Sequence, residues 1–293
     1  LEDGDFVVVW ESNGQDSSDY GIYGQRYNAT GATVGGEFRV NTYTANSQGG
    51  PSMTGLEDGG FVVVWTSSGQ DGSGDGIYGQ RYNATSATVG SEFQVNTNTT
   101  SDQKTPSIVS LEDGGFVVVW IGQGSSDSLG IFGQRYNATG GTVESEFQIN
   151  TYTSLTQSYP CIARLDEGAF VVAWQSDGQD GSNDGIYGQR YNATGSAVDS
   201  EFRVNSYTTN YQSRPSIASL NHSGFVVVWE SEGQDDSSDG IYGQRYDANG
   251  GAIELVLPDP TGQPSSAPSY LTTTFTSLSQ LKTATDLYCQ NVT

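Results

Sequence analysis

The chain has 293 residues, 34% of them hydrophobic and 39 of them glycine, and it carries a formal net charge of −23. Its 34 acidic residues against 11 basic ones exclude a polyanion-binding face, because too few cations are present to replace the counterions of a phosphate backbone. No apolar run is long enough to cross a membrane, and one histidine with two cysteines provides too few ligands for a zinc site. We therefore expect neither a nucleic-acid partner nor membrane insertion.

One pentapeptide, Phe-Val-Val-Val-Trp, recurs along the chain and ends on a tryptophan each time. It occupies residues 6–10, 61–65, 116–120 and 225–229, and a variant with alanine in the fourth position occupies residues 170–174. A β-strand that is apolar without alternation is buried on both faces. The pentapeptide therefore predicts five repeats, each built around a doubly buried strand.

Four strands in hairpin order are predicted within each repeat, and the second repeat illustrates them. They are residues 51–54, which have small side chains, 61–65, which are apolar, 77–82, which alternate, and 92–96, which are the most polar. Asp58-Gly59, between the first two strands, tolerates the positive φ angles of a primed hairpin turn. The gradient from small to polar strands suits a crowded centre and an exposed outer edge.

This unit predicts an all-β fold, namely a β-propeller of five four-stranded antiparallel blades over residues 1–257. An open β-solenoid or stacked repeat array would use the same unit without closing a ring, and it remains the alternative. Residues 258–293 form a tail rich in serine, threonine and proline. The first repeat lacks its first strand, and we expect Pro268–Thr272 to supply it and close blade one; further N-terminal blades in the natural protein are the competing explanation.

Asparagine sequons recur at one position of the repeat, the turn after the third strand. The repeated Asn-Ala-Thr sequons begin at Asn28, Asn83, Asn137 and Asn192, and isolated Asn-x-Ser/Thr matches begin at Asn98, Asn221 and Asn291. Asparagine suits a turn by itself, but four matches at one exposed turn favour N-linked glycosylation and a secreted or cell-surface location. The fifth repeat has Asp247 at this position.

Acidic loops follow the tryptophan in repeats two, four and five, with the pattern Asp-x-Ser-x-Asp-Gly. The candidate ligands are Asp71, Asp75, Asp180, Asp184, Asp235 and Asp239. Closely spaced hard oxygen ligands suit calcium, which is the one cofactor that the sequence suggests. A solvated turn rich in aspartate is the alternative explanation, because no bidentate glutamate completes an EF-hand loop.

The two cysteines, Cys161 and Cys289, could form a disulfide that fixes the tail, provided that the compartment is oxidising. An intermolecular bridge is the alternative. No nucleophile in the sequence has a base beside it, and no acidic pair differs from the repeat background. We therefore expect the protein not to be an enzyme.

The repeat resembles the tandem Gly-Gly-Phe-Val-Val-Val-Trp, Gly-Gln-Asp-Gly-Ser, Gly-Ile-Tyr-Gly-Gln-Arg-Tyr and Glu-Phe-Gln-Val-Asn-Thr repeats of very large secreted bacterial surface proteins. Those repeats often stand beside haemolysin-type calcium-binding repeats. The resemblance covers residues 1–258 and implies extracellular adhesion or architecture rather than a defined reaction. In that family the turn after the third strand usually begins with Asp, as at Asp247, so the four Asn-Ala-Thr turns depart from it.

These observations predict a non-enzymatic, extracellular structural or adhesive module, N-glycosylated and part of a larger surface assembly or filament. Its expected partners are further copies of itself or other extracellular matrix and surface proteins, with glycans as a further class. A lectin-like propeller that binds glycans in clefts between blades is one alternative. A glycoside hydrolase is another, and it would require one blade to depart from the others.

Overall fold

The structure is a computed structural model, and it describes residues 1, 4–124, 129–220, 224–235 and 238–253. The tail of residues 258–293 lies outside the described residues, and so does the expected strand Pro268–Thr272. Among the described residues, no helix is long and apolar enough to cross a membrane.

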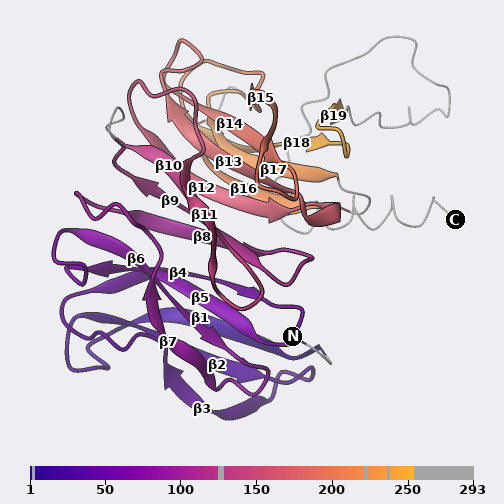
Figure 1. Cartoon of the computed structure of the whole chain (residues 1–293). Coiled ribbons are helices and arrows are strands. Elements are labelled where there is room, and N and C mark those ends of the chain that lie inside the picture. Colours follow the sequence, from indigo (N-terminus) through magenta and orange to yellow (C-terminus); the bar gives the residue numbers. More distant parts are fainter. Residues whose placement is uncertain (2–3, 125–128, 221–223, 236–237, 254–293) are drawn as a thin grey trace, which may run out of the picture.

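The described residues form five antiparallel sheets, which we number 1 to 5 in chain order (Figure 1). Sheet 1 holds β1 (Phe6–Asn13), β2 (Tyr20–Tyr27) and β3 (Thr33–Arg39), and sheet 2 holds β4 (Gln48–Gly55), β5 (Phe61–Ser68), β6 (Asp75–Tyr82) and β7 (Thr88–Gln94). Sheet 3 holds β8 (Lys104–Ser110), β9 (Phe116–Gly122), β10 (Gly130–Tyr136) and β11 (Thr142–Gln148). Sheet 4 holds β12 (Gln157–Arg164), β13 (Phe170–Asp177), β14 (Asp184–Tyr191) and β15 (Ala197–Arg203), with a short 3₁₀ helix (Asp166–Gly168) between β12 and β13. Sheet 5 holds β16 (Gln212–Ser219), β17 (Phe225–Glu232), β18 (Asp239–Tyr246) and β19 (Ala252–Ile253).

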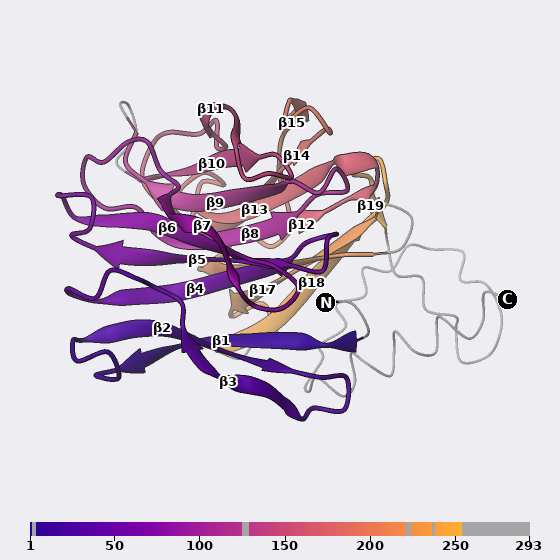
Figure 2. The same ribbon diagram turned by 60° about the horizontal axis from the view of Figure 1, so that its bottom comes forward.

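The strands of every sheet lie in hairpin order, which confirms the predicted all-β class and the repeating antiparallel unit. Sheets 2 to 5 have four strands, whereas sheet 1 has three among the described residues. The sheets follow one another in chain order, from β1–β3 to β16–β18 (Figures 1 and 2). Arg164 at the end of β12 pairs with Glu57 of sheet 2 at 2.9 Å, although sheet 3 separates these sheets in chain order. The series of sheets therefore curves, so that the end of β12 approaches the turn after β4.

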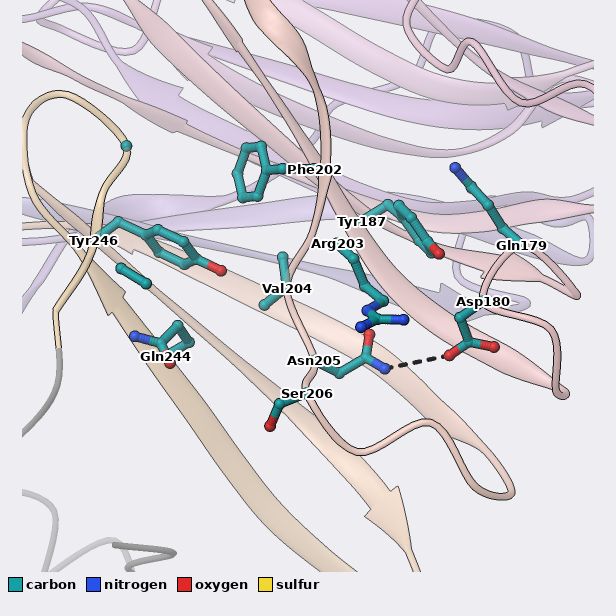
Figure 3. A pocket seen from close by; sticks show the side chains of 12 residues that line it. Gln179, Asp180, Tyr187, Phe202, Arg203, Val204, Asn205, Ser206, Gln244 and Tyr246 are labelled. Carbon is teal, nitrogen blue, oxygen red and sulfur yellow. Dashed lines mark hydrogen bonds between the residues drawn. The ribbon is translucent and has the colours of Figure 1, made fainter. Parts of the chain in front are cut away.

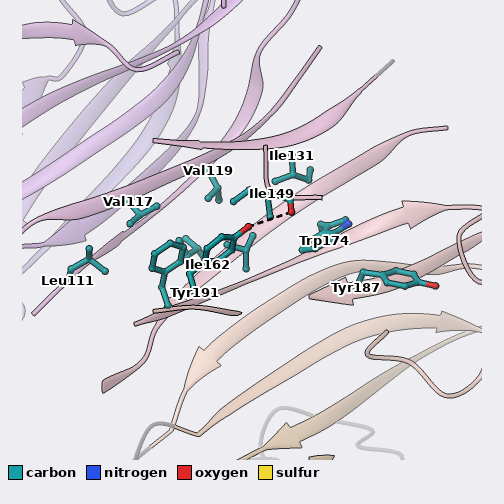
Figure 4. Packing of buried hydrophobic residues seen from close by; sticks show 11 residues of the cluster. Leu111, Val117, Val119, Ile131, Ile149, Ile162, Trp174, Tyr187 and Tyr191 are labelled. Carbon is teal, nitrogen blue, oxygen red and sulfur yellow. Dashed lines mark hydrogen bonds between the residues drawn. The ribbon is translucent and has the colours of Figure 1, made fainter. Parts of the chain in front are cut away.

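Neighbouring sheets are joined by the same apolar contact, which we call a seam. At the seam between sheets 3 and 4, Val117, Val119 and Ile131 pack against Phe170, Val172 and Trp174 (Figure 4). Equivalent residues form the clusters at the other three seams. Because each side chain that leaves water contributes about 1.5–3 kcal/mol, the seams supply much of the force that holds the sheets together.

Each seam also contains an arginine from one sheet bound to a backbone carbonyl of the next. Arg81 Nη2 donates to the Ala138 carbonyl at 2.7 Å, and Arg135 Nη2 donates to the Ala193 carbonyl at 2.7 Å. Arg26 and Arg190 make the equivalent bonds from sheets 1 and 4. The contact always runs from one sheet to the next in the chain, so every seam has the same direction. The arginines that recur in the repeat are thus structural.

The two outermost faces of the assembly differ from the seams. Phe6 and Val8 of β1 are each 44% exposed and Ile241 of β18 is 49% exposed, whereas Phe61, Val63 and Ile77 at the same positions of sheet 2 are 0% exposed. The prediction that every Phe-Val-Val-Val-Trp strand is buried on both faces is therefore wrong for the first repeat. The physical reason is that, among the described residues, sheet 1 has a neighbouring sheet on one side only.

The turn between the first two strands also differs from the prediction. In this turn of sheet 2, Gly59 has a positive φ of 76° and the residues before it do not, whereas a primed two-residue turn requires a positive φ at its first central residue. The Gly59 amide donates to the Leu56 carbonyl at 3.1 Å, and the Leu56 amide donates to the Gly60 carbonyl at 2.8 Å. This is the three-residue hairpin loop, in which an ordinary turn is followed by a left-handed glycine.

Candidate functional site

A strained bulge recurs in the first strand of sheets 2 to 5. In each, the register of pairing shifts just before a proline, and the residue before that proline has a left-handed φ. These residues are Gly50 (φ 60°), Thr105 (φ 50°), Tyr159 (φ 51°) and Arg214 (φ 51°). A non-glycine residue in this conformation is strained, and strain of this kind concentrates at functional sites. At these bulges the backbone conformation is similar in the four sheets, whereas the side chain before the proline differs from sheet to sheet.

The residue after each tryptophan lies beside the bulge of the next sheet. Glu11 Oε1 accepts a hydrogen bond from the Gly50 amide at 2.5 Å, and Gln175 Oε1 accepts one from the Arg214 amide at 3.2 Å. The equivalent positions in the remaining sheets hold Thr66, Ile121 and Glu230. Within the described residues, Glu230 has no following bulge to bind, so its carboxylate is available for other contacts.

In sheets 4 and 5 these positions form a polar cluster around Arg214. Arg214 Nη1 lies 3.3 Å from Glu230 Oε2 and 3.4 Å from Oε1, and Ser213 Oγ donates to Glu230 Oε2 at 3.4 Å. The Tyr159 side chain also hydrogen bonds to Arg214, and its ring is 46% exposed. Glu230 raises the pKa of Arg214 further above its ordinary value. A cation, a carboxylate and a phenol thus meet at an open surface.

A second carboxyl group is connected to this cluster through Gln175. The Asp184 side chain hydrogen bonds to Gln175, whose own oxygen binds the Arg214 amide. Partial burial raises the pKa of Asp184, and the neighbouring carboxylates of Asp177 and Asp180 raise it further against the opposing effect of the Gln175 bond. The Asp184 carboxyl therefore stays protonated to higher pH than usual, while the Glu230 carboxylate contacts the Arg214 guanidinium.

A groove with a volume of about 630 Å³ lies between sheets 4 and 5 (Figure 3). Tyr187, Phe202 and Tyr246 contribute aromatic rings to its wall, and Asp180 and Arg203 contribute charged groups. Asn205 Nδ2 donates to Asp180 Oδ2 at 3.4 Å, the dashed line in Figure 3. Aromatic faces beside a few placed polar groups are typical of pockets for small polar molecules with apolar faces.

The predicted calcium ligands are distributed among other contacts. Asp75 pairs with Lys104 at 3.2 Å, Asp71 Oδ1 accepts from the Ser73 amide at 3.0 Å, and Asp184 belongs to the cluster described above. Asp180 accepts from Asn205, and Asp235 and Asp239 are exposed. In the part of the chain that the structure describes, no three acidic, histidine or cysteine groups come together as a metal site. Calcium binding thus stays a prediction without a geometric counterpart.

The repeated sequons lie where they were expected, in the turn after the third strand, which is exposed at Asn83, Asn137 and Asn192 and half-buried at Asn28. Asn98 is half-buried in a link between sheets, and Asn221 and Asn291 lie outside the described residues.

Within the described residues Cys161 of β12 has no disulfide partner, and Cys289 lies outside them, so their pairing stays a prediction. The Cys161 thiol donates to the Ala173 carbonyl at 3.5 Å, and burial raises its pKa to about 12. Such a thiol is a poor nucleophile at neutral pH, because the thiolate is the reactive form.

Comparison with known proteins finds likeness in structure but not in sequence. No family model and no curated protein matches the chain. A thermostable family-43 glycoside hydrolase is similar with a TM-score of 0.51 and 8% identity, over 93% of this chain and 94% of its own. A Hadza microbial sialidase is similar with a TM-score of 0.56 and 12% identity, over 85% of this chain and 55% of its own. An α-L-arabinofuranosidase from Lactobacillus brevis is similar with a TM-score of 0.48 and 10% identity, over 86% of this chain and 90% of its own.

These neighbours contradict two expectations from the sequence, the non-enzymatic adhesive module and the absence of enzymatic activity. A family-43 glycoside hydrolase and a sialidase share this fold over 93% and 85% of this chain. The sequence argument failed because it searched for one blade that departs strongly from the others. The departures are single residues, at the position before each proline and at the position after each tryptophan. Comparing those two positions across repeats would have found Tyr159, Arg214 and Glu230.

Proposed function

We propose that the protein is a glycoside hydrolase whose active site is the cluster of Tyr159, Arg214 and Glu230. The observation that carries the proposal is the break in the repeat. The two positions are the residue before the proline and the residue after the tryptophan. There, sheets 4 and 5 place a phenol and a carboxylate that each contact the guanidinium of Arg214. The fold shared with a family-43 glycoside hydrolase supports the same assignment.

Most glycoside hydrolases cleave the glycosidic bond with two carboxyl groups in different protonation states. Asp184, with its raised pKa, suits the general acid that protonates the leaving oxygen. Glu230, whose carboxylate contacts the Arg214 guanidinium, suits the group that activates water or attacks the anomeric carbon. Tyr159, whose ring is 46% exposed, would orient the sugar.

We further propose that the five sheets are the blades of a propeller that closes between sheet 5 and sheet 1. Each seam joins a face of Phe, Val and Trp to a face of two small apolar residues and an Ile. Sheet 1 has an uncovered face of the first kind, with Phe6 and Val8, and sheet 5 has an uncovered face of the second kind, with Ile241. The two uncovered faces are the halves of a fifth seam.

We also propose that the protein acts outside the cell, on extracellular glycans. The repeated sequons and the resemblance to secreted surface proteins support this location. The relation of the repeat to those proteins remains a prediction.

Hydrolysis can be tested with purified protein on p-nitrophenyl pentosides and hexosides and on a fluorogenic sialoside. We expect turnover of at least one substrate and a loss of about 10²–10⁴-fold in kcat for Glu230→Gln. Asp184→Asn should also lower kcat, and it should remove the limb of the pH profile where activity falls as the general acid deprotonates.

Glu11→Gln is the matched control, because Glu11 occupies the same repeat position but binds the Gly50 amide. It should leave kcat unchanged. Absence of turnover on every substrate, or full activity in a folded Glu230→Gln variant, would contradict the proposed function.

A further inference from the structure

We propose that Asn28, Asn83, Asn137 and Asn192 carry N-linked oligosaccharides and that Asn98, although it begins a sequon, does not. All five asparagines begin a sequon in the sequence, but the structure shows that their side-chain amides make different hydrogen bonds. The proposal is independent of the hydrolase function, because none of these residues lies in the candidate active site.

The four repeated asparagines use only the oxygen of the side-chain amide. Asn83 Oδ1 accepts hydrogen bonds from the Thr85 amide at 3.0 Å, the Thr85 hydroxyl at 2.8 Å and the Ala87 amide at 2.9 Å. The threonine hydroxyl makes the same bond at Asn28, Asn137 and Asn192. With the described residues, Nδ2 of none of the four makes a hydrogen bond. The nitrogen that would carry a sugar is therefore the unengaged end of each side chain.

Asn98 uses its side chain in the opposite way. Its Nδ2 donates to the Gln123 carbonyl at 2.7 Å, while Oδ1 accepts from the Thr100 amide at 2.9 Å. The nitrogen therefore points at the backbone of sheet 3, and the residue is half-buried. A sugar on this nitrogen would lie against the chain at Gln123 and would displace that contact.

The fifth repeat shows that the turn does not need the sequon. Asp247 replaces asparagine there, and its Oδ1 accepts from the Asn249 amide at 2.8 Å and the Gly251 amide at 2.8 Å. The same backbone turn thus forms with no hydroxyl and no side-chain amide. The turn therefore does not need the asparagine amide or the threonine hydroxyl of the other four repeats. Their presence favours a function other than stabilising the turn.

The position of the turns would place the oligosaccharides at the outer ends of the seams. The alanine between asparagine and threonine binds the arginine of the preceding sheet in three of the four sequons, through the carbonyls of Ala84, Ala138 and Ala193. This bond fixes the turn, and the exposed side chains of Asn83, Asn137 and Asn192 extend away from it. Oligosaccharides there would cover the turns without contacting the apolar seams.

The modification is a group transfer without oxidation or reduction. Asparagine Nδ2 forms a bond to the anomeric carbon of an oligosaccharide donor that is activated by a diphosphate leaving group. The carbon–oxygen bond to the diphosphate breaks, its electron pair leaves with the diphosphate, and one proton passes from Nδ2 to solvent.

The test is site mapping on protein secreted from a eukaryotic host. Digestion with a peptide N-glycosidase in ¹⁸O-labelled water converts each occupied asparagine to labelled aspartate, which mass spectrometry locates. We expect label at Asn28, Asn83, Asn137 and Asn192 and none at Asn98. Label at Asn98, or its absence from the four turns, would overturn the proposal.

Matched variants separate the modification from folding. Thr85→Ala should abolish label at Asn83 alone and leave the fold intact, because the turn at Asp247 forms without a hydroxyl. Thr85→Ser should retain the label. Thr100→Ala, at the Asn98 sequon, should leave the pattern unchanged, and any label lost from Asn98 in that variant would contradict its exclusion.

Discussion

The same five residues occur in β1 and β5, yet they have different surroundings. Phe61, Val63 and Trp65 of β5 are 0% exposed, because sheet 2 has a sheet on each side. Phe6 and Val8 of β1 are 44% exposed. Identical sequence therefore gives a buried core strand in one place and an open apolar face in another. Burial in a repeat protein depends on the neighbour that a face meets, and not on the residues of that face alone.

The largest expected effect compares the tryptophans of these two strands. Trp65→Ala should lower the free energy of unfolding by about 3–5 kcal/mol, because it leaves a cavity in a closed seam. Trp10→Ala should cost a similar amount if sheet 5 covers sheet 1, as the proposed closed propeller requires, and less than about 2 kcal/mol if that face is open. Chemical denaturation of both variants measures the difference. A clearly smaller loss for Trp10→Ala would contradict the closed propeller.

A smaller effect compares two arginines that contact different partners. Arg81 is 9% exposed and binds the Ala138 carbonyl within a seam, so Arg81→Ala should cost about 1–3 kcal/mol. Arg164 pairs with Glu57 at an exposed position, so Arg164→Ala should cost less than about 1 kcal/mol. Denaturation curves of the two variants would test the order. If Arg164→Ala proved the more costly, the seam contacts would not be the main links between sheets.

The smallest expected effect is the dependence of stability on high pH. Burial raises the pKa of Tyr78 and of Tyr187 to about 12. The unfolded chain releases these protons near pH 10 while the folded protein retains them, so stability is complete below pH 10 and falls as the pH rises towards 12. Tyr78→Phe should reduce this fall between pH 9 and pH 11.5, as measured by urea denaturation at each pH.

Tyr20 provides the control for that measurement, because its ring is 44% exposed at the open end of sheet 1. Tyr20→Phe should leave the pH dependence of unfolding unchanged. A change as large as that of Tyr78→Phe would mean that burial of the tyrosine ring does not cause the loss of stability at high pH.

Much of the fold could be predicted from the sequence, because the repeat encodes it five times. The apolar run of Phe61–Trp65 specifies a doubly buried strand, and Ile77 and Arg81 share the face that meets sheet 3. The open face of Phe6 and Val8 could not be predicted in this way, because the first repeat has the same residues as its covered counterparts. The turn at Gly59 was misjudged because Asp-Gly also fits the three-residue loop.

Little of the candidate site could be predicted, because it depends on contacts between repeats. Nothing in the sequence shows that Gln175 binds the Arg214 amide, or that Tyr159 reaches Arg214. Both contacts depend on the bulge before Pro160 and Pro215, where a left-handed φ aims the side chain outward. The sequence did contain an indication of the site. The residues before each proline and after each tryptophan vary between repeats whose other motifs recur.

The one-way direction of the arginine contacts has a consequence for how the protein is made. Arg81 bonds to a carbonyl 57 residues further along the chain, and Arg135 to one 58 residues further. During synthesis each finished sheet must therefore wait for the next repeat to emerge before its second face is covered. At about 5–20 residues per second this wait lasts about 3–12 s. Throughout it the growing chain displays a bare apolar face on its newest sheet, besides the open face of Phe6 and Val8 on sheet 1. Aggregation during expression should accordingly begin at that advancing face, whichever repeat it belongs to.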